Sequence, residues 1–147
     1  MNDHAVDFGI DKMAALLGQV FAPWVQDLGL RPVSAAAHGA RFVLPGNARL
    51  ARGGGDGPGV VCGQALASAA DTASVVTLAS LNGRFRNCTT VDLTVHFLRP
   101  LPVGDIEVDV EALSNGRRMA TTRVEFRAVG GGKLAATATC AFAYLED

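Results

Sequence analysis

Apolar residues near the N-terminus recur every three or four positions, which is the spacing of one face of an α-helix. This pattern covers residues 8–26, and we expect Pro23 to break or kink the end of the helix. Two short strand-like runs follow at residues 33–37 and 40–44, with His38-Gly39 as the hairpin turn between them. The first part of the chain therefore predicts a helix and a β-hairpin.

A longer helix is predicted at residues 64–81, where Ala, Leu, Val, Ser and Thr dominate the sequence. Asn82-Gly83 follows as a left-handed C-terminal stop. Because this helix is apolar nearly all round, it must be covered on several sides, and its small side chains allow a sheet to approach closely.

The rest of the chain supplies that sheet. Apolar and polar residues alternate at residues 91–97 and 106–112, and two further strands are predicted at residues 118–129 and 134–145. The first of these strands is expected to be half-buried through Val91, Leu93, Val95 and Phe97. We predict an antiparallel meander of hairpin-linked strands, and hence an α+β fold in which a curved antiparallel sheet wraps a long central helix, with an N-terminal helix beside it.

The composition fits one domain. With 147 residues, 49% of them hydrophobic, the chain can fill a single core. No internal repeat or linker is evident, so we expect one domain over residues 1–147, with an N-terminal helical segment over about residues 1–30. The formal net charge of −1 gives no global field to attract an anionic partner. We therefore expect neither nucleic acid nor a membrane as a partner.

The cysteines indicate a reduced compartment. There are three of them, widely spaced, and no pair or Cys/His cluster has the spacing of a zinc site. The N-terminal residues are acidic where a signal peptide would be basic. These features favour a cytoplasmic protein without a metal or redox cofactor.

Asp71 is the single charged residue between Pro58 and Gly83, and it lies in the middle of the long predicted helix. Burial of a carboxylate is costly unless a partner compensates it. Asp71 either lies in a polar seam or caps a neighbouring loop, or it performs chemistry. It is the most informative residue of the chain.

The same helix starts at Cys62-Gly63-Gln64, where none of the usual capping residues is present. The N–H groups of the first turn are then available to a ligand oxygen, and glycine lets the ligand approach the backbone. The positive end of the helix dipole favours developing negative charge, as an oxyanion hole requires. Water or the Gln64 side chain is the alternative partner for these donors.

Eight residues separate Gly63 from Asp71, which is about 12 Å along a helix. One chain does not easily bring both to one small group. If both act on one substrate, a two-fold dimer can place Asp71 of one subunit against the helix start of the other. We therefore expect a homodimer, or a tetramer formed as a dimer of dimers.

Three motifs resemble one known family. Residues 61–73, VCGQALASAADTA, look like the His-Gly-Gly…Ala-Asp-Thr-Ala segment of hotdog-fold acyl-CoA thioesterases of the phenylacetate-pathway (PaaI-like) type, in the 4-hydroxybenzoyl-CoA thioesterase superfamily. Residues 90–100, TVDLTVHFLRP, are similar to that family's Thr-Val-x-Leu-x-x-x-Phe-Leu-Arg-Pro strand, and residues 116–118 fall on its Gly-Arg hairpin. The motifs occur in the family's order over roughly residues 55–145.

The resemblance implies a hotdog fold and roles for four residues. Asp71 matches the family's acidic residue, which acts as general base on water or as nucleophile on the thioester carbonyl. Gly63 matches the backbone donor to the thioester oxygen. Thr90 matches a hydroxyl that orients the water, or is an ordinary threonine at a strand start. Asp56 lies near a polar position that faces the thioester in some relatives, or is a turn residue.

The helix start departs from the family pattern. Cys62 stands where the family has His, and Gln64 where it has a second Gly. Gln64 either hydrogen-bonds the thioester or water, or caps its own helix. Cys62 is a small buried filler rather than a nucleophile, because no His is near it in sequence. Both are candidate substrate-binding residues.

Arginines at loops and strand ends are candidates for the phosphates of coenzyme A, because the guanidinium fork suits phosphate oxygens. Arg117 and Arg118 are the better candidates, and Arg84, Arg86 and Arg99 the weaker ones. The alternative interpretation is that they are solvated surface charges.

From these features we expect an enzyme that hydrolyses acyl- or aryl-coenzyme A and needs no cofactor, coenzyme A being part of the substrate. A non-catalytic acyl-thioester binding protein is one alternative. Another is a hotdog hydratase or dehydratase, although those usually need a His beside the acid. The candidates for the acyl pocket, each of which also fits the core, are Leu66, Val75, Phe85 and Phe97.

Overall fold

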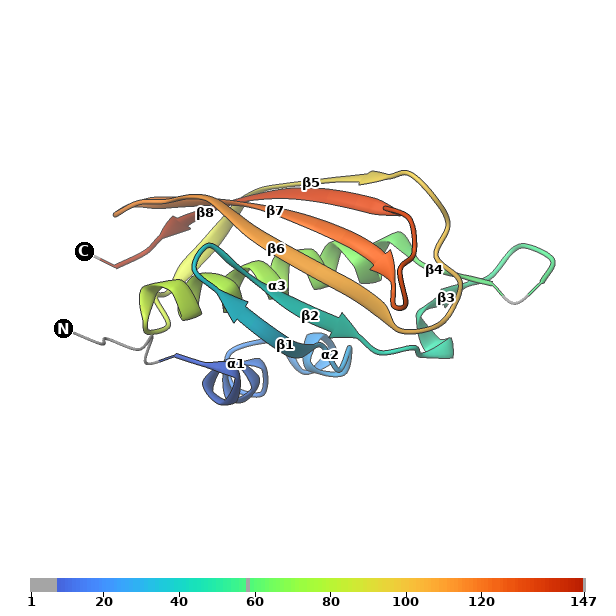
Figure 1. Cartoon of the computed structure of the whole chain (residues 1–147), viewed down its shortest axis with the longest axis horizontal. Coiled ribbons are helices and arrows are strands. Elements are labelled where there is room, and N and C mark those ends of the chain that lie inside the picture. The colour runs from blue at the N-terminus through green and yellow to red at the C-terminus, as the bar shows by residue number, and fades with distance from the viewer. Residues whose placement is uncertain (1–7, 58, 147) are drawn as a thin grey trace.

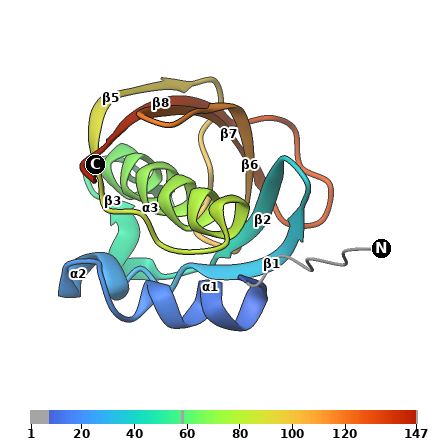
Figure 2. The ribbon, with the colours of Figure 1, turned by 90° about the vertical axis from the view of Figure 1, so that its left-hand side faces the viewer.

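The computed structural model describes residues 8–57 and 59–146, so residues 1–7 of the predicted N-terminal helical segment lie outside the described residues. A six-stranded antiparallel sheet curves around the long helix α3 (Gly63–Asn82), which confirms the predicted hotdog architecture (Figures 1 and 2). The strands of this sheet are β1 (Arg31–Ala36), β2 (Gly39–Leu44), β5 (Cys88–Phe97), β6 (Ile106–Asn115), β7 (Met119–Ala128) and β8 (Ala136–Tyr144).

Helix α3 has the composition that close packing under a sheet requires. Most of its buried side chains are Ala, Ser or Thr, and Ser74, Thr77 and Ser80 among them have hydrogen-bond partners. Ser74 and Thr122 of β7 share a hydrogen bond of 2.7 Å between their hydroxyls, and Thr77 donates to the carbonyl of Ala73 at 2.8 Å. The helix ends as predicted, with Gly83 in the left-handed conformation at φ 72°.

One face of α3 remains uncovered. Its residues that are exposed or only half-buried include Gln64, Ser68, Asp71 and Val75, which lie three or four positions apart and therefore share one side of the helix. The sheet and α1 (Ile10–Leu17) occupy the other sides. The other elements thus cover α3 on several sides, as predicted, but leave this one face of the helix open within one chain.

The sheet order corrects the predicted meander. The order is β1-β2-β6-β7-β8-β5, so β6, β7 and β8 form a meander, whereas β5 pairs with β8 at the edge. The segment between β5 and β6 carries Pro100 and Pro102 and crosses between strands that are not neighbours. Proline lacks the N–H that a tight hairpin ladder needs at this point, so the segment forms a crossing loop instead of a turn.

Strand β5 also differs from its predicted burial. Leu93, Val95 and Phe97 lie opposite buried residues of β8 and so face the helix side, as predicted, but Leu93 is 37% and Phe97 58% exposed. Val91 lies at a break in register and is 53% exposed. Because β5 is an edge strand, the described residues cover only part of its inner face, where it contacts α3. The half-buried prediction was therefore wrong for most of this strand.

The N-terminal region is split where one helix was predicted. Helix α1 ends at Leu17, with Gly18 at its C-cap, and Pro23 begins the short helix α2 (Pro23–Gln26). Proline is tolerated at the first position of a helix because that N–H has no intrahelical partner. The predicted β1–β2 hairpin is confirmed, and both short helices lie below α3 in Figures 1 and 2.

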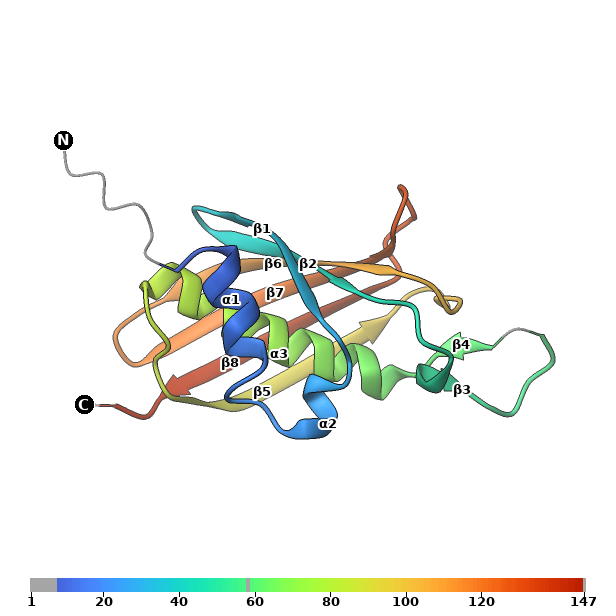
Figure 3. The same ribbon diagram turned by 90° about the horizontal axis from the view of Figure 1, so that it is seen from below.

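Two short elements were not predicted. After the turn η1 (Ala48–Leu50), β3 (Ala51–Arg52) and β4 (Val60–Val61) pair as a two-stranded ribbon whose glycine-rich loop projects away from the sheet (Figure 3). This ribbon leads directly into α3 and so determines where that helix starts.

Gly39 provides a test of the sheet packing. A Cβ at Gly39 would lie 2.1 Å from the carbonyl oxygen of Val110 in the neighbouring strand. Since backbone cannot move aside easily, we expect Gly39→Ala to lower the free energy of unfolding by about 1–3 kcal/mol. Urea unfolding measures this, with Gly53→Ala as the control, because a Cβ at Gly53 meets nothing within 4 Å. Equal unfolding midpoints for the two variants would contradict the close approach.

Candidate functional site

The start of α3 is held in place from two sides. The N–H of Val61 donates to the carbonyl of Leu101 at 2.8 Å, and the N–H of Cys62 donates to the carbonyl of Leu50 at 2.8 Å. Cys62 occupies the N-cap position with extended backbone and makes no side-chain cap. Among the described residues, no acceptor receives the N–H of Gly63 or Gln64. Two backbone donors at the positive end of a 20-residue helix are therefore available.

Gly63 allows an aromatic ring to lie against this first turn. A Cβ at Gly63 would lie 2.9 Å from the Cζ of Phe97, the last residue of β5. The ring of Phe97 is thus a wall beside the free donors. The sequence predicts Phe97 as a strand residue and a candidate for the acyl pocket or the core, but not as a neighbour of Gly63, because the two are far apart in the chain.

The structure brings two of the predicted site residues together. The hydroxyl of Thr90 donates to Oδ1 of Asp71 at 2.7 Å. Thr90 lies opposite Phe142 of β8, whose side chain is buried, so its own side chain points to the helix side. The register changes directly after Thr90, between Thr90 and Asp92. Asp71 therefore receives one hydrogen bond from β5 and lies half-buried on the uncovered face of α3.

The carboxylate and the donors do not meet within one chain. Asp71 follows Gly63 by eight residues on an uninterrupted helix, so they are about 12 Å apart along its axis. Gln64 and Asp71 share the uncovered face, as described above. Any group that touches both the helix start and Asp71 of the same chain would have to span this distance.

The thiols of Cys88 and Cys140 near Asp71 are poor nucleophiles. Burial raises the pKa of the Cys88 thiol, and the Asp71 carboxylate raises it further, while Arg86 lowers it. Burial also raises the pKa of Cys140, which packs beside Ser74 and Thr122. Because the thiolate is the reactive form, the raised pKa makes both thiols less reactive. Cys62 is half-buried at the helix start.

Two hollows flank the helix start. One, of about 450 Å³, is lined by Gly63, Leu66, Phe97 and Arg99 together with residues of β4 and the crossing loop. The other, of about 240 Å³, lies between α2 and the first turn of α3. Of the predicted acyl-pocket residues, Leu66 and Phe97 line the first hollow, Val75 lies on the uncovered face of α3, and Phe85 follows the end of α3.

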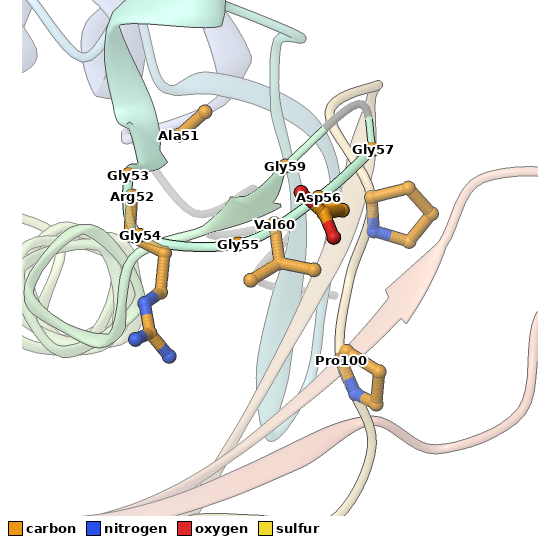
Figure 4. A pocket seen from close by; sticks show the side chains of 11 residues that line it. Ala51, Arg52, Gly53, Gly54, Gly55, Asp56, Gly57, Gly59, Val60 and Pro100 are labelled. Atoms are coloured by element: carbon orange, nitrogen blue, oxygen red, sulfur yellow. The ribbon is translucent and has the colours of Figure 1, made fainter.

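Asp56 does not join these residues. It lies exposed in the glycine-rich loop of the β3–β4 ribbon, where it lines an open hollow of about 700 Å³ (Figure 4). This hollow shares Arg52, Val60 and Pro100 with the hollow beside Gly63, but Asp56 does not line the latter. Its position therefore fits the alternative interpretation of a loop residue within one chain.

Arg117 and Arg118 lie at the opposite end of α3. Their hairpin is tied to Asn82, the last residue of α3, by a closed ring of hydrogen bonds that runs from Asn82 to the Tyr144 hydroxyl at 2.9 Å, on to Asn115 at 2.6 Å, and back to Asn82 at 2.8 Å. This end is about 28 Å from Gly63 along the helix. Among the described residues, no ion pair engages Arg117 or Arg118.

The weaker arginine candidates are already engaged. Arg84 donates to both carboxylate oxygens of Glu146, at 3.1 and 2.7 Å, and Arg86 donates to the same carboxylate. These two guanidinium groups lower the pKa of Glu146 to about 2. Arg86 also stacks on the Tyr144 ring, 3.6 Å from its centre. Both arginines therefore have structural partners, whereas Arg99 lines the hollow beside Gly63.

Two features are absent from the described residues. In the part of the chain that the structure describes, no group of His, Cys, Asp and Glu side chains is arranged to hold a metal ion. None of the described helices combines the length and the hydrophobicity that a membrane span requires.

Comparison with known proteins agrees with the fold described above. No curated protein sequence matches the chain significantly. The chain is similar to the solved structure of a conserved protein from Pseudomonas aeruginosa, with 29% identity over 87% of this chain and 98% of that one and a TM-score of 0.73. It also shares its fold with a thioesterase from Haemophilus influenzae, at 16% identity over 95% of this chain and 92% of that one, with a TM-score of 0.80.

A further structure with this fold is zebrafish thioesterase superfamily member 2, at 18% identity over 92% of this chain and 98% of that one, with a TM-score of 0.78. The family model of the thioesterase superfamily matches residues 58–135, a segment that contains the helix start, Asp71 and Thr90. Since this match spans more than half of the sequence, the chain belongs to the thioesterase superfamily.

Proposed function

We propose that the protein hydrolyses acyl-coenzyme A thioesters, with Asp71 as the acidic catalytic group and the Gly63 N–H as the donor to the thioester oxygen. The observation that carries this proposal is the hydrogen bond from Thr90 to Oδ1 of Asp71 on the uncovered face of α3. That bond holds the carboxylate and leaves its second oxygen for water or substrate. Free backbone donors at the start of the same helix supply the complementary charge.

The reaction follows from these groups. The Asp71 carboxylate takes a proton from a water molecule whose oxygen attacks the thioester carbon, and the negative charge on the carbonyl oxygen is held by the helix-start N–H groups. The carbon–sulfur bond then breaks, and the proton passes to the sulfur, which gives a carboxylic acid and free coenzyme A. In the nucleophilic variant, Asp71 itself attacks, and water hydrolyses the resulting anhydride. Either route needs only water as co-reactant.

We propose further that two chains share each site. Strand β5 is a ten-residue edge strand whose inner face exposes Leu93 and Phe97 beside the uncovered face of α3. An unpaired edge with exposed apolar side chains is a surface that a partner chain can cover. A two-fold axis beside β5 would place Asp71 of one subunit against the helix start of the other. This arrangement resolves the distance of about 12 Å within one chain.

Arg117 and Arg118 fit the phosphates of coenzyme A in the same arrangement. They lie beyond Asn82, about 16 Å along the helix from Asp71, and no ion pair among the described residues engages them. We therefore propose that the subunit that supplies Asp71 also supplies these arginines. Cys62 and Gln64 line the acyl side of the helix start, while Asp56 remains a candidate for contact with substrate from its loop.

The first expected outcome concerns Asp71. Asp71→Asn keeps the size of the side chain and removes the base, so we expect the rate of thiol release from acyl-coenzyme A to fall by about 10²-fold or more. Asp92→Asn is the matched control, because Asp92 is an exposed carboxylate on β5, the edge strand that also carries Thr90. If Asp71→Asn releases thiol as fast as the control, Asp71 is not catalytic. Binding of the ester without any release by the unaltered protein would favour a thioester-binding protein.

A mixing experiment tests the shared site. Gly63→Pro removes one donor at a helix position that accepts proline, and the extended backbone of Cys62 suits a following proline. When the Gly63→Pro and Asp71→Asn chains exchange subunits, heterodimers contain one intact site. We expect about one quarter of the unaltered activity from an equal mixture.

Gly63→Ala is the control for this mixture, because it adds a Cβ beside Phe97 but keeps the N–H. It should retain more activity than Gly63→Pro. Absence of recovered activity after confirmed subunit exchange would contradict the shared site.

If Arg117 and Arg118 bind the phosphates of coenzyme A, their loss should affect coenzyme A esters and pantetheine esters differently. Replacing Arg117 and Arg118 by Ala should raise KM for coenzyme A esters, since each well-formed charge-assisted contact contributes about 1.5–3 kcal/mol. Pantetheine esters lack the nucleotide phosphates, so their KM should stay unchanged. Arg123→Ala is the control, because Arg123 is exposed on the outer face of β7. An unchanged KM for the coenzyme A esters in the double variant would place phosphate binding elsewhere.

A further inference from the structure

The smaller hollow at the helix start is walled by the N-terminal part of the chain. It is lined by Trp24, Asp27 and Leu28 from α2 and the residues after it, by Asn47, Arg49 and Leu50 around η1, and by Cys62, Gln64 and Ala65 from the first turn of α3. All but the last three precede residue 58, where the match to the superfamily model begins. Most of the wall therefore lies outside the segment that matches the superfamily model.

We infer that this hollow receives the acyl group of the substrate and that Trp24 limits the size of the acyl group that enters. The inference rests on the proposed thioester hydrolysis, because it takes the Gly63 and Gln64 N–H groups as the place of the carbonyl oxygen. A carbonyl held there has a hollow on either side, one toward Trp24 and one toward Phe97. The acyl group and the coenzyme A part of the substrate, which acts as its carrier, must therefore occupy different hollows.

The charge and the burial of the lining residues indicate which hollow receives the acyl group and which receives the coenzyme A carrier. The hollow beside Phe97 is larger, includes Arg52 and Arg99, and borders the end of β5, so it suits the long, phosphate-bearing carrier. The hollow beside Trp24 contains one acid and one base, Asp27 and Arg49, and is therefore balanced in charge. Its apolar lining includes the buried side chains of Leu28 and Ala65. This lining suits an acyl group.

Trp24 is positioned as a wall rather than as part of the core. Its side chain is 62% exposed although indole is large and apolar. The short helix that carries it is fixed by Pro23 at its first position and by a hydrogen bond of 2.7 Å from the Gln26 side chain to the carbonyl of Phe21. An exposed indole on a fixed turn beside a hollow gains burial when a ligand enters.

The relative size of the two hollows bears on the substrate class. The hollow beside Trp24, of about 240 Å³, is open to solvent and is about half the size of the hollow beside Phe97, of about 450 Å³. A compact acyl group, such as octanoyl or an acyl group with one ring, suits the smaller hollow better than a hexadecanoyl chain does. We therefore expect compact acyl groups to be preferred over long chains.

Enzyme kinetics test the role of Trp24. For butanoyl-, octanoyl-, dodecanoyl- and hexadecanoyl-coenzyme A, the unaltered protein should show its highest kcat/KM at or below octanoyl. Trp24→Ala should raise the dodecanoyl-to-butanoyl ratio of kcat/KM by about tenfold, and Trp24→Phe by less. Val20→Ala is the control, an exposed apolar residue that does not line the hollow. An unchanged ratio in Trp24→Ala would overturn the inference.

Fluorescence gives a readout that does not depend on hydrolysis. Trp24 is the single tryptophan of the chain, so tryptophan emission reports this position alone. Octyl-coenzyme A, a thioether that cannot be hydrolysed, should shift the emission to shorter wavelength, and free coenzyme A should not. Emission that stays unchanged with the saturating thioether, or that is equally changed by free coenzyme A, would overturn the inference.

The two measurements separate this inference from the proposed function. Hydrolysis with an unchanged chain-length profile and unchanged emission would retain the proposed function and overturn the acyl pocket. A shift in emission with octyl-coenzyme A, without hydrolysis of any ester, would support the pocket and overturn the proposed hydrolysis.

Discussion

Burial of α3 is the constraint on which the rest of the structure depends. The helix is apolar nearly all round, so it is stable only where other elements exclude water from it. Its small side chains let the sheet approach closely, and the shared hydroxyl bond of Ser74 and Thr122 shows that even polar contacts with the sheet are satisfied internally. One chain covers this helix on all sides except the face of Gln64 and Asp71. The candidate site lies on that remaining face.

The position of each candidate group follows from this arrangement. The helix start carries free donors because Cys62 provides no cap and because two backbone hydrogen bonds fix the preceding segment. The carboxylate of Asp71 is held from β5 by Thr90, and the same edge strand ends at Phe97 beside Gly63. Strand β5 thus contacts both the middle and the start of α3. Because β5 contacts both groups of the candidate site, a partner that covers this edge would also affect the positions of Asp71 and of the helix start.

The replacement of two family positions at the helix start has a structural counterpart. Where the resembling family has His and a second Gly, Cys62 and Gln64 line the hollow beneath Trp24. Cys62 is smaller than the family's His, and Gln64 is larger than the family's Gly. Together they change the shape of this hollow, while the Gly63 N–H between them stays free. The departure from the family pattern therefore affects the space beside the donors more than the donors themselves.

The sequence by itself determined the local elements and the chemistry of single residues. The long helix, its stop at Gly83, the β1–β2 hairpin and the β6-β7-β8 meander follow from periodicity and turn residues, which act over a few positions. The isolation of Asp71 and the missing cap at Cys62 were visible for the same reason. Only the tertiary structure decided that β5 pairs with β8 at an edge, that Thr90 contacts Asp71, and that a tryptophan of the N-terminal segment walls the helix start. These contacts join residues far apart in the chain, and alternation along a strand fixes which face a side chain takes but not which strand becomes its neighbour.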